Sequence, residues 1–278
     1  MALSGLGGDE LFAGYRTFAD TPRLARLMRL AWFAPAPLRR AVAPVLRSLL
    51  AQKNDSDGAR KALDAWLSPD ALPHPYFFTR TLFPVSYLPQ LTEPRFRPSA
   101  VNADGVTLEP TWLGWLERSA DAARKLEPLG AVSWLEMRSY MVSTLLRDTD
   151  SVSMAQSLEV RVPLLDTPLV EFMGSLPDAA RQRAGTQKAL FVESLSDILP
   201  PEILARRKRT FTLPWKEWLQ GPLRARLERS FGDPAPAFAA HMRMDGVRDV
   251  WSAFVAGKTS WSRPWSLYVL NEWCRRHL

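Results

Sequence analysis

The chain has 278 residues, enough for one or two domains, and 46% of them are hydrophobic, which is ample for a buried core. It carries 36 Lys and Arg against 29 Asp and Glu, and the resulting net charge of +7 favours anionic ligands. The single cysteine, Cys274, excludes an intrachain disulfide framework and a cysteine-based metal site. No apolar run approaches the roughly 20 residues that cross a bilayer, so we expect no membrane partner and a reducing, cytoplasmic location.

The N-terminal residues Met1 to Gly5 are typical of the end of a buried strand. A buried parallel strand needs neighbours for its backbone groups, so we expect further sequence upstream of Met1. A glycine-rich turn, SGLGGDE, follows at residues 4–10. The apolar spacing after it predicts a single helix that carries Leu11, Phe12, Tyr15 and Phe18.

The glycines of this turn allow the backbone to approach a ligand closely, and the start of the helix offers free N–H groups to an anion. Asp9 then has two interpretations. It caps the helix, or it serves as a Mg²⁺ ligand beside phosphate, because magnesium prefers carboxylate and phosphate oxygens. The residues of this segment alone leave both interpretations open.

The next segments are predicted to be mainly helical. Residues 23–51 form basic amphipathic helices whose apolar side favours packing over attachment to a membrane surface. An exposed loop is expected at 94–105. Further helices are expected at 57–67, 112–123 and 132–147, and a proline-broken stretch at 69–98 contributes the core residues Tyr76, Phe77, Phe78 and Phe83.

The run LLRDTDSVSMAQSLEVRVPLLD at residues 145–166 is the most informative stretch of the sequence. Apolar residues repeat every four positions over 137–145 and predict a helix that leads into it. Pro163 disfavours helical backbone in the residue before it, so a short extended segment follows. Thr167 then begins another helix, which either Asp166 or Thr167 itself caps.

Six charged residues of this run are set among apolar and small neighbours. Burying a charge is costly unless it is paired or hydrogen-bonded. Arginine and carboxylate form fixed, directional pairs, so we predict a buried network of such pairs. The network either only fixes the packing or also supports a ligand site. Its members are Arg147, Asp148, Asp150, Glu159, Arg161 and Asp166.

A second cationic segment, RRKRTF, lies at residues 206–211. Its four consecutive cations, which include Lys208, are able to clamp phosphates, but a solvated basic loop has the same composition. Further helices are expected at 168–176, 188–198, 215–219, 223–229, 247–255 and 264–277, with a short one from Pro200. Their tryptophans are interpreted as packing residues.

Together, SGLGGDELFAGY at 4–15, the run at 145–166 and RRKRTF at 206–211 closely resemble the synthetase domain of the glutamine-dependent asparagine synthetase family. The resemblance covers residues 3 to about 220, with a helical tail at 221–278, and we expect 1–278 to be a single partial domain. It implies a mainly α chain, the C-terminal helical part of an α/β ATP pyrophosphatase domain of the PP-loop type, which is adenine nucleotide α-hydrolase-like.

The resemblance also implies a chemistry that uses ATP and Mg²⁺. A carboxylate is activated as an acyl-adenylate with release of pyrophosphate, and ammonia from glutamine then forms the amide. Residues Ser4, Gly5 and Gly7 would bind the nucleotide, and Asp9 would lie near the Mg²⁺–pyrophosphate. Lys208 would stabilise phosphate charge as the adenylate forms. The charged run would brace the floor of this site.

Two departures from the family pattern bear on the activity. Leu6 stands where asparagine synthetases usually carry glutamate, and leucine cannot accept a proton, so either another group does so or the acceptor is not aspartate. The sequence contains no SGGxDS pyrophosphate loop, and residue 2 is Ala2, so it has no N-terminal glutaminase cysteine. Both features are expected upstream, and we predict weak or no activity from this chain alone.

Two other interpretations compete with an asparagine synthetase-like activity. One is an inactive helical remnant or binding module of the same family. The other is a nucleic-acid binder, which the net charge of +7 allows but the scattered arginines do not favour. The expected partners are therefore a small carboxylate and ammonia, with no nucleic acid. An incomplete sheet edge at residues 2–4 predicts self-association, which is compatible with a homodimer.

Overall fold

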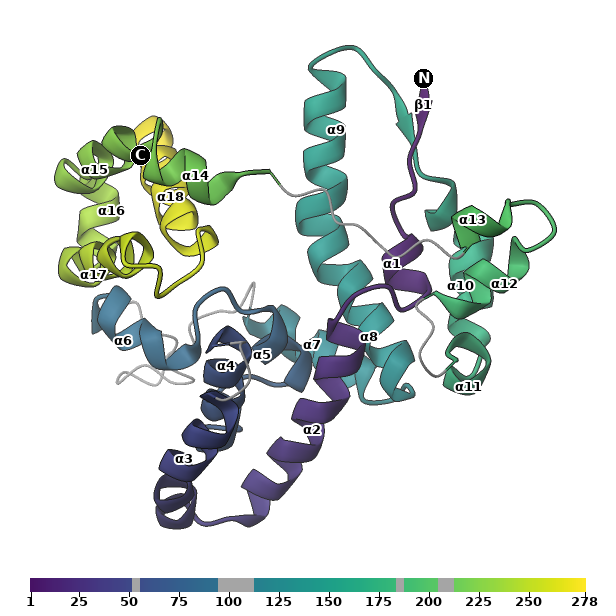
Figure 1. Cartoon of the computed structure of the whole chain (residues 1–278), viewed down its shortest axis with the longest axis horizontal. Helices are drawn as coiled ribbons and strands as arrows, with labels where there is room; N and C mark the ends of the chain where they lie inside the picture. The colour runs from purple at the N-terminus through teal and green to yellow at the C-terminus, as the bar shows by residue number, and fades with distance from the viewer. Residues whose placement is uncertain (52–55, 95–112, 184–187, 205–212) are drawn as a thin grey trace. The chain divides into compact units, whose positions relative to one another are not determined.

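The computed structural model describes residues 1–51, 56–94, 113–183, 188–204 and 213–278 (Figure 1). It is mainly α-helical, as the sequence predicts. The chain forms two compact units. Unit 1 consists of the described parts of Met1–Pro35, Leu72–Arg80 and Glu109–Lys208, and unit 2 of the described parts of Ala36–Ala71, Thr81–Leu108 and Arg209–Leu278.

Unit 1 contains the sheet found within the described residues. Its strands, β1 (Ala2–Leu3) and β2 (Val160–Arg161), pair in parallel with Ala2 opposite Val160. The helical elements of unit 1 are α1 (Gly8–Leu11), α2 (Thr17–Phe33), α5 (Pro75–Arg80), α7 (Leu113–Ala123), α8 (Pro128–Glu136), the π-helix η3 (Met137–Leu146), α9 (Arg147–Met154), the 3₁₀ turn η4 (Pro163–Leu165), α10 (Thr167–Ser175), α11 (Asp178–Arg181), α12 (Ala189–Ser194) and α13 (Pro201–Leu204).

The helix predicted at 132–147 is part of a longer one, because α8, η3 and α9 follow one another without a break (Figure 1). Pro128 lies in its first turn, where a missing backbone N–H has no cost. The middle of this helix widens into π geometry. There the Ser139 hydroxyl donates a hydrogen bond to the Leu135 carbonyl. In an α-helix this carbonyl would accept from the Ser139 amide, so the hydroxyl competes with the backbone hydrogen bond.

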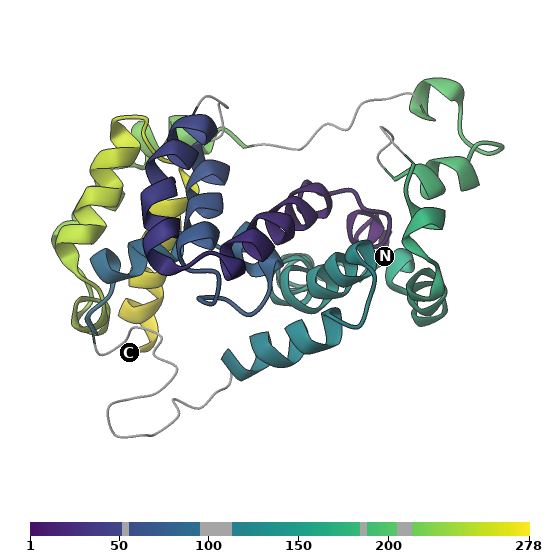
Figure 2. The ribbon, with the colours of Figure 1, turned by 90° about the horizontal axis from the view of Figure 1, so that it is seen from below.

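The apolar core of unit 1 lies between α2, α5, α7 and α8, and α2 runs alongside α8 in both views (Figures 1 and 2). Tyr76, Phe77 and Phe78 are buried, which confirms their prediction as core residues. Tyr76 and Phe77 pack with α7 and α8 residues that recur at helical spacing. The cluster consists of Phe18, Tyr76, Phe77, Leu116, Ala120, Ala123, Leu129, Ala131, Val132 and Leu135.

A buried ion pair lies beside this core. Glu136 is fully buried, and both of its carboxylate oxygens accept hydrogen bonds from Arg80, while Thr17 donates a third at 2.6 Å. The Arg80 guanidinium also lies 5.1 Å from the ring centroid of Tyr15 and 4.3 Å from that of Tyr140. These contacts offset the cost of removing both charges from water.

The named elements of unit 2 within its described residues are all helical, and an isolated antiparallel β-bridge pairs Thr92 with Met242. Its elements are α3 (Ala36–Ala51), α4 (Ser56–Leu67), the 3₁₀ turn η1 (Val85–Tyr87), α6 (Leu88–Leu91), α14 (Trp215–Gln220), α15 (Arg224–Gly232), α16 (Pro236–His241), α17 (Met244–Val255) and α18 (Ser262–His277). These agree with the predicted helices, except that η1, α6 and α16 have no counterpart among the predictions.

The core of unit 2 is formed by α6 and the C-terminal helices. Gly246 allows α17 to approach α6, because a β-carbon there would lie only 1.9 Å from the Gln90 carbonyl oxygen. Arg263 is buried and bonds to Asp57, to Thr259 and to the Leu82 carbonyl, so one cation joins three segments of this unit. The core residues include Leu91, Leu219, Leu227, Phe231, Phe238, Val247, Val250, Phe254, Leu267 and Tyr268.

Within the part of the chain that the structure describes, no helix combines the length and apolar character needed to cross a membrane.

Candidate functional site

The predicted nucleotide-binding residues Ser4, Gly5 and Gly7 lie in one turn directly after β1. The Ser4 amide donates to the Arg161 carbonyl at 2.8 Å, which extends the pairing of the two strands into the turn. Gly7 has φ +96°, and a β-carbon on it would lie 2.6 Å from Leu165 Cδ2, so this position requires glycine. Gly5 is exposed, and a β-carbon there would meet nothing within 4 Å.

The expected burial of the strand is wrong, because Leu3 is 73% exposed. The expected continuous helix through Phe18 is also wrong. Helix α1 ends at Leu11 and α2 begins at Thr17, with a left-handed residue, Ala13, between them. The chain turns here because the Gly14 amide donates to the Asp9 carbonyl at 2.8 Å.

The break in the helix folds residues 13–15 back over α1. Gly14 packs so closely on the Asp9 carboxylate that a β-carbon on it would lie 1.9 Å from Asp9 Oδ1. One residue later, the Tyr15 hydroxyl donates to the Glu10 carboxylate at 2.8 Å. A continuous helix would have carried residues 13–15 away from these two acids. The observed turn instead brings this segment into contact with both Asp9 and Glu10.

Asp9 forms an ion pair with Lys188, with 3.0 Å between Oδ1 and Nζ. The two side chains are 24% and 25% exposed, so the pair is accessible to solvent but partly enclosed. The interpretation of Asp9 as the helix cap is wrong, because the cap position belongs to Gly7 and Asp9 lies within the first turn.

Lys188 was not predicted from the sequence, where it is a single lysine before a short apolar segment. Its position results from tertiary packing. Helix α12 begins directly after Lys188, and its Phe191 lies against Phe12 with ring centroids 4.7 Å apart. The packing of α12 on α1 thus brings the lysine to Asp9, and no local pattern could have indicated it.

Glu10, beside Asp9, points into unit 1 and is 1% exposed. Burial raises the pKa of its carboxyl, and the hydrogen bond from Tyr15 opposes this increase. Its backbone carbonyl accepts a hydrogen bond of 2.7 Å from the Ser133 hydroxyl of α8. These contacts fix the turn to the long helix.

A cavity of about 260 Å³ adjoins this turn and is lined by Phe12, Tyr15, Arg16, Arg181 and Lys188, among other residues. Arg181 is only 3% exposed and donates to the Leu11 carbonyl at 2.9 Å. Burial lowers the pKa of its guanidinium, and nearby Asp178 opposes this. The charged side chains that line the cavity are all basic, namely Arg16, Arg181, Arg183 and Lys188.

The predicted burial of the charged run is wrong: all six charged residues are exposed. The ion pair that joins two of them within the described residues is Arg161 with Glu159, at 2.6 Å and with side chains 64% and 55% exposed. The physical reason is that α9 continues η3 as one helix and packs mainly on the short strand β2 among the described elements, so most of its surface is left open (Figure 1). The predicted course of the backbone is confirmed, since Asp166 holds the cap position of α10.

The predicted catalytic residue Lys208 and the rest of 206–211 lie outside the described residues, as does nearly all of the predicted loop at 94–105. Within the described part of the chain, the candidate site therefore consists of the turn at 4–10, Asp9 with Lys188, and the adjoining cationic cavity.

Comparison with known proteins gives the family. The family model described as Asparagine synthase matches residues 1–275, so this chain belongs to the asparagine synthase family. The match includes residues of both units and extends beyond residue 220, where the predicted resemblance ends.

Individual relatives agree with the family model. The chain is 24% identical to "Asparagine synthetase [glutamine-hydrolyzing] 1" of Bacillus subtilis (strain 168), over 98% of this chain and 40% of that protein. It is 26% identical to the "Putative asparagine synthetase [glutamine-hydrolyzing]" of Mycobacterium tuberculosis (strain ATCC 25618 / H37Rv), over 98% and 39%. "Amidase chyE" of Penicillium rubens is 25% identical over 38% of this chain and 17% of its own length.

The chain thus spans about two-fifths of the length of the relatives that it matches from end to end. No solved structure matches it.

Proposed function

We propose that this chain is part of an ATP-dependent, amide-forming synthetase, and that its turn at residues 4–10 handles the phosphates of ATP. In the proposed reaction, a carboxylate oxygen of the acceptor attacks the α-phosphorus of ATP, the bond to the β-phosphate breaks, and pyrophosphate leaves. Ammonia from glutamine then attacks the acyl carbon of the adenylate, AMP leaves, and the nitrogen loses a proton to give the amide.

The ion pair between Asp9 and Lys188 carries this proposal. It lies beside a turn that follows the carboxyl end of a parallel strand, the end at which open α/β sheets bind their ligands. As pyrophosphate leaves, negative charge grows on its oxygens, and a positioned cation lowers the barrier electrostatically. We assign Lys188 this role, together with the predicted Lys208.

A Mg²⁺ ion is compatible with the residues present. The described residues contain no group of three or more His, Cys, Asp or Glu that could enclose a metal. Magnesium at nucleotide sites is usually held by one or two carboxylates, with phosphates and water as its other ligands, and Asp9 supplies one such carboxylate at the turn. Bound Mg²⁺ would neutralise charge on the phosphate oxygens.

Gly14 supports this assignment, since the absence of a side chain there leaves the room that the Asp9 carboxylate occupies. Ser4 and Gly5 lie at the start of the turn, where a hydroxyl and exposed backbone are available to the nucleotide. With Leu6 between them and Asp9, this part of the turn offers no proton acceptor of its own. Aspartate is for this reason only one candidate for the small carboxylate that we propose as the acceptor. We also propose a cytoplasmic location.

Carboxylate-dependent exchange of pyrophosphate into ATP tests the proposal, because it reports adenylate formation without ammonia. The assay compares the 278-residue chain with any longer protein that contains it, over aspartate and other small carboxylates. We expect exchange from the longer protein and weak or no exchange from this chain alone, which contains no SGGxDS loop.

Made in the longer protein, the variants Asp9→Asn and Lys188→Gln should each reduce pyrophosphate exchange at least about 100-fold, the usual effect of removing a charge-stabilising group. Lys125→Gln, which removes an exposed lysine from the same unit, is the matched control and should change little. For Lys208→Ala, lost exchange at unchanged stability supports a chemical role, whereas a loss of stability alone favours the remnant. Absence of exchange with every carboxylate in the longer protein would overturn the proposal.

A further inference from the structure

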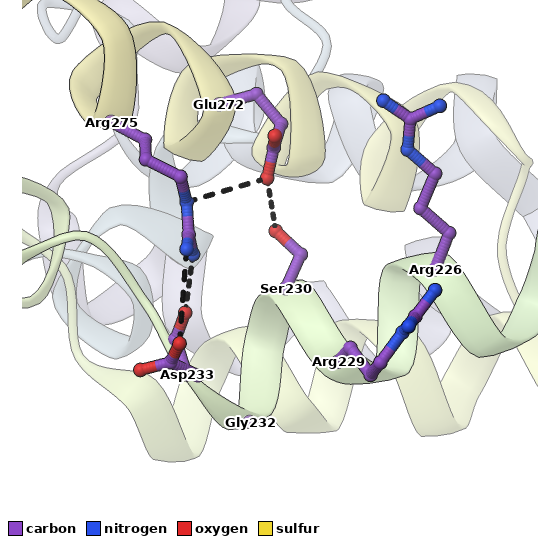
Figure 3. Close-up of a pocket in the computed structure, with 7 residues that line it drawn as sticks. All are labelled: Arg226, Arg229, Ser230, Gly232, Asp233, Glu272 and Arg275. Carbon is purple, nitrogen blue, oxygen red and sulfur yellow. Dashed lines mark hydrogen bonds and ion pairs between the residues drawn. The ribbon is translucent and has the colours of Figure 1, made fainter.

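A groove in unit 2 lies between α15 and α18 and encloses a volume of about 520 Å³ (Figure 3). Three arginines from the two helices line it, together with two carboxylates and the Ser230 hydroxyl. All of these residues belong to unit 2, and none belongs to the turn that carries Asp9. The volume lies in the range of small-molecule sites.

At one end of the groove the charges are paired with one another. The Arg275 guanidinium lies 3.7 Å from an Asp233 carboxylate oxygen and 3.8 Å from one of Glu272. Glu272 also accepts a hydrogen bond of 3.0 Å from Ser230, as the dashed lines in Figure 3 mark. Both carboxylates of the groove are therefore already engaged by Arg275.

At the other end, Arg226 and Arg229 project from successive turns of the same face of α15 (Figure 3). Within the described residues, neither forms an ion pair with a carboxylate. The acid that lies between them in the sequence, Glu228, is paired with Arg224 at 2.9 Å. This end of the groove therefore carries two positive charges that the described acids do not neutralise.

Both arginines are exposed, and each makes one further contact within the unit. The Arg226 guanidinium carbon lies 5.5 Å from the ring centroid of Tyr268, and Arg229 Nε donates to the Ala225 carbonyl at 3.3 Å. Tyr268 is itself buried, and its hydroxyl has no hydrogen-bond partner among the described residues. Arginines restrained in this way lose less side-chain entropy when they bind an anion.

We propose that this groove binds a phosphate-bearing small molecule through Arg226 and Arg229. A guanidinium presents a planar fork of donors that matches phosphate oxygens, and a phosphate dianion balances two unpaired cations. The Ser230 hydroxyl and the engaged Arg275 line the other end of the groove. The proposal does not depend on the assignment of the turn that contains Asp9.

Isothermal titration of the full chain with inorganic pyrophosphate tests the site, at constant ionic strength and with EDTA present. EDTA removes Mg²⁺, which the turn at Asp9 is proposed to require. We expect saturable binding that weakens at least tenfold in the double variant Arg226→Gln/Arg229→Gln. The matched control is Arg248→Gln on α17 of the same unit, which removes an exposed arginine outside the groove and should change the affinity less than twofold.

Four outcomes would overturn the proposal: no saturable binding by the unaltered chain, an equal loss from the Arg248 control, succinate binding as tightly as pyrophosphate, or binding that is lost in Lys188→Gln but kept in the double variant. An equal loss would indicate diffuse attraction by net charge, and tight succinate binding would assign the groove to dicarboxylates. The variant Lys188→Gln separates this site from the first one. If it abolishes binding while the double variant does not, pyrophosphate binds at the turn and the groove assignment fails.

Discussion

Unit 1 contains two regions that are similarly rich in charge but differ in burial. Around the glycine turn, Glu10 and Glu136 are buried and bonded to Tyr15 and Arg80. In the run at 145–166, all six charged residues are exposed. The difference shows that charge set among apolar residues does not by itself predict burial, because burial depends on which other elements lie against the segment.

The largest expected effect comes from breaking the buried pair. Glu136→Ala leaves the Arg80 charge without its partner, and loss of one member of a buried pair typically costs about 3–5 kcal/mol. The matched control is Glu159→Ala in the exposed pair with Arg161, where the cost should be below about 1 kcal/mol. Urea unfolding of both variants measures the contrast. Equal losses would mean that burial does not distinguish the two regions.

The next effect concerns the backbone of the turn. Gly7→Ala places a β-carbon at φ +96° and 2.6 Å from Leu165, which should cost about 1–3 kcal/mol. Gly5→Ala in the same turn meets nothing within 4 Å and should change stability by less than about 0.5 kcal/mol. Thermal unfolding of the pair tests whether this conformation is enforced. A well-tolerated Gly7→Ala would show that the turn adapts.

A smaller effect is expected in the pH dependence of stability. Burial raises the pKa of Glu10 above its ordinary value of 4.5, so the folded chain holds this proton at a pH where the unfolded chain has released it. The contribution of Glu10 to stability therefore falls as pH rises from about 4.5 through the raised value. Subtracting the stability curve of Glu10→Gln from that of the unaltered chain isolates this contribution. A difference that increases with pH would contradict the assigned direction.

The smallest effect on stability is expected from the exposed run. Asp148→Asn and Asp150→Asn should each change the free energy of unfolding by less than about 0.5 kcal/mol, because both side chains face solvent in this chain. The same variants in a longer, active protein then separate the two interpretations of the run. Reduced pyrophosphate exchange at unchanged stability would support a role in the site. Unchanged exchange would mean that these two aspartates have no role in the site.

The parts of the fold that follow from local pattern were predictable. The long helix leading into 145–166, the extended segment before Pro163 and the restart at Thr167 result from apolar spacing and from the conformational restrictions of proline. The break between α1 and α2 was not predictable in this way. It depends on Gly14 packing against Asp9 and on Tyr15 reaching Glu10, contacts that an apolar pattern does not encode.

The sequence by itself determined the class of this protein. The mainly helical fold, the family and the residues of the glycine turn all follow from motifs whose order and composition are local properties of the chain. Only the tertiary structure decided that Lys188 lies at Asp9, that Glu136 is buried with Arg80, and that the charged run is exposed. These outcomes depend on residues far apart in the chain, brought together by the packing of whole helices, and a one-dimensional pattern does not specify which helix faces which.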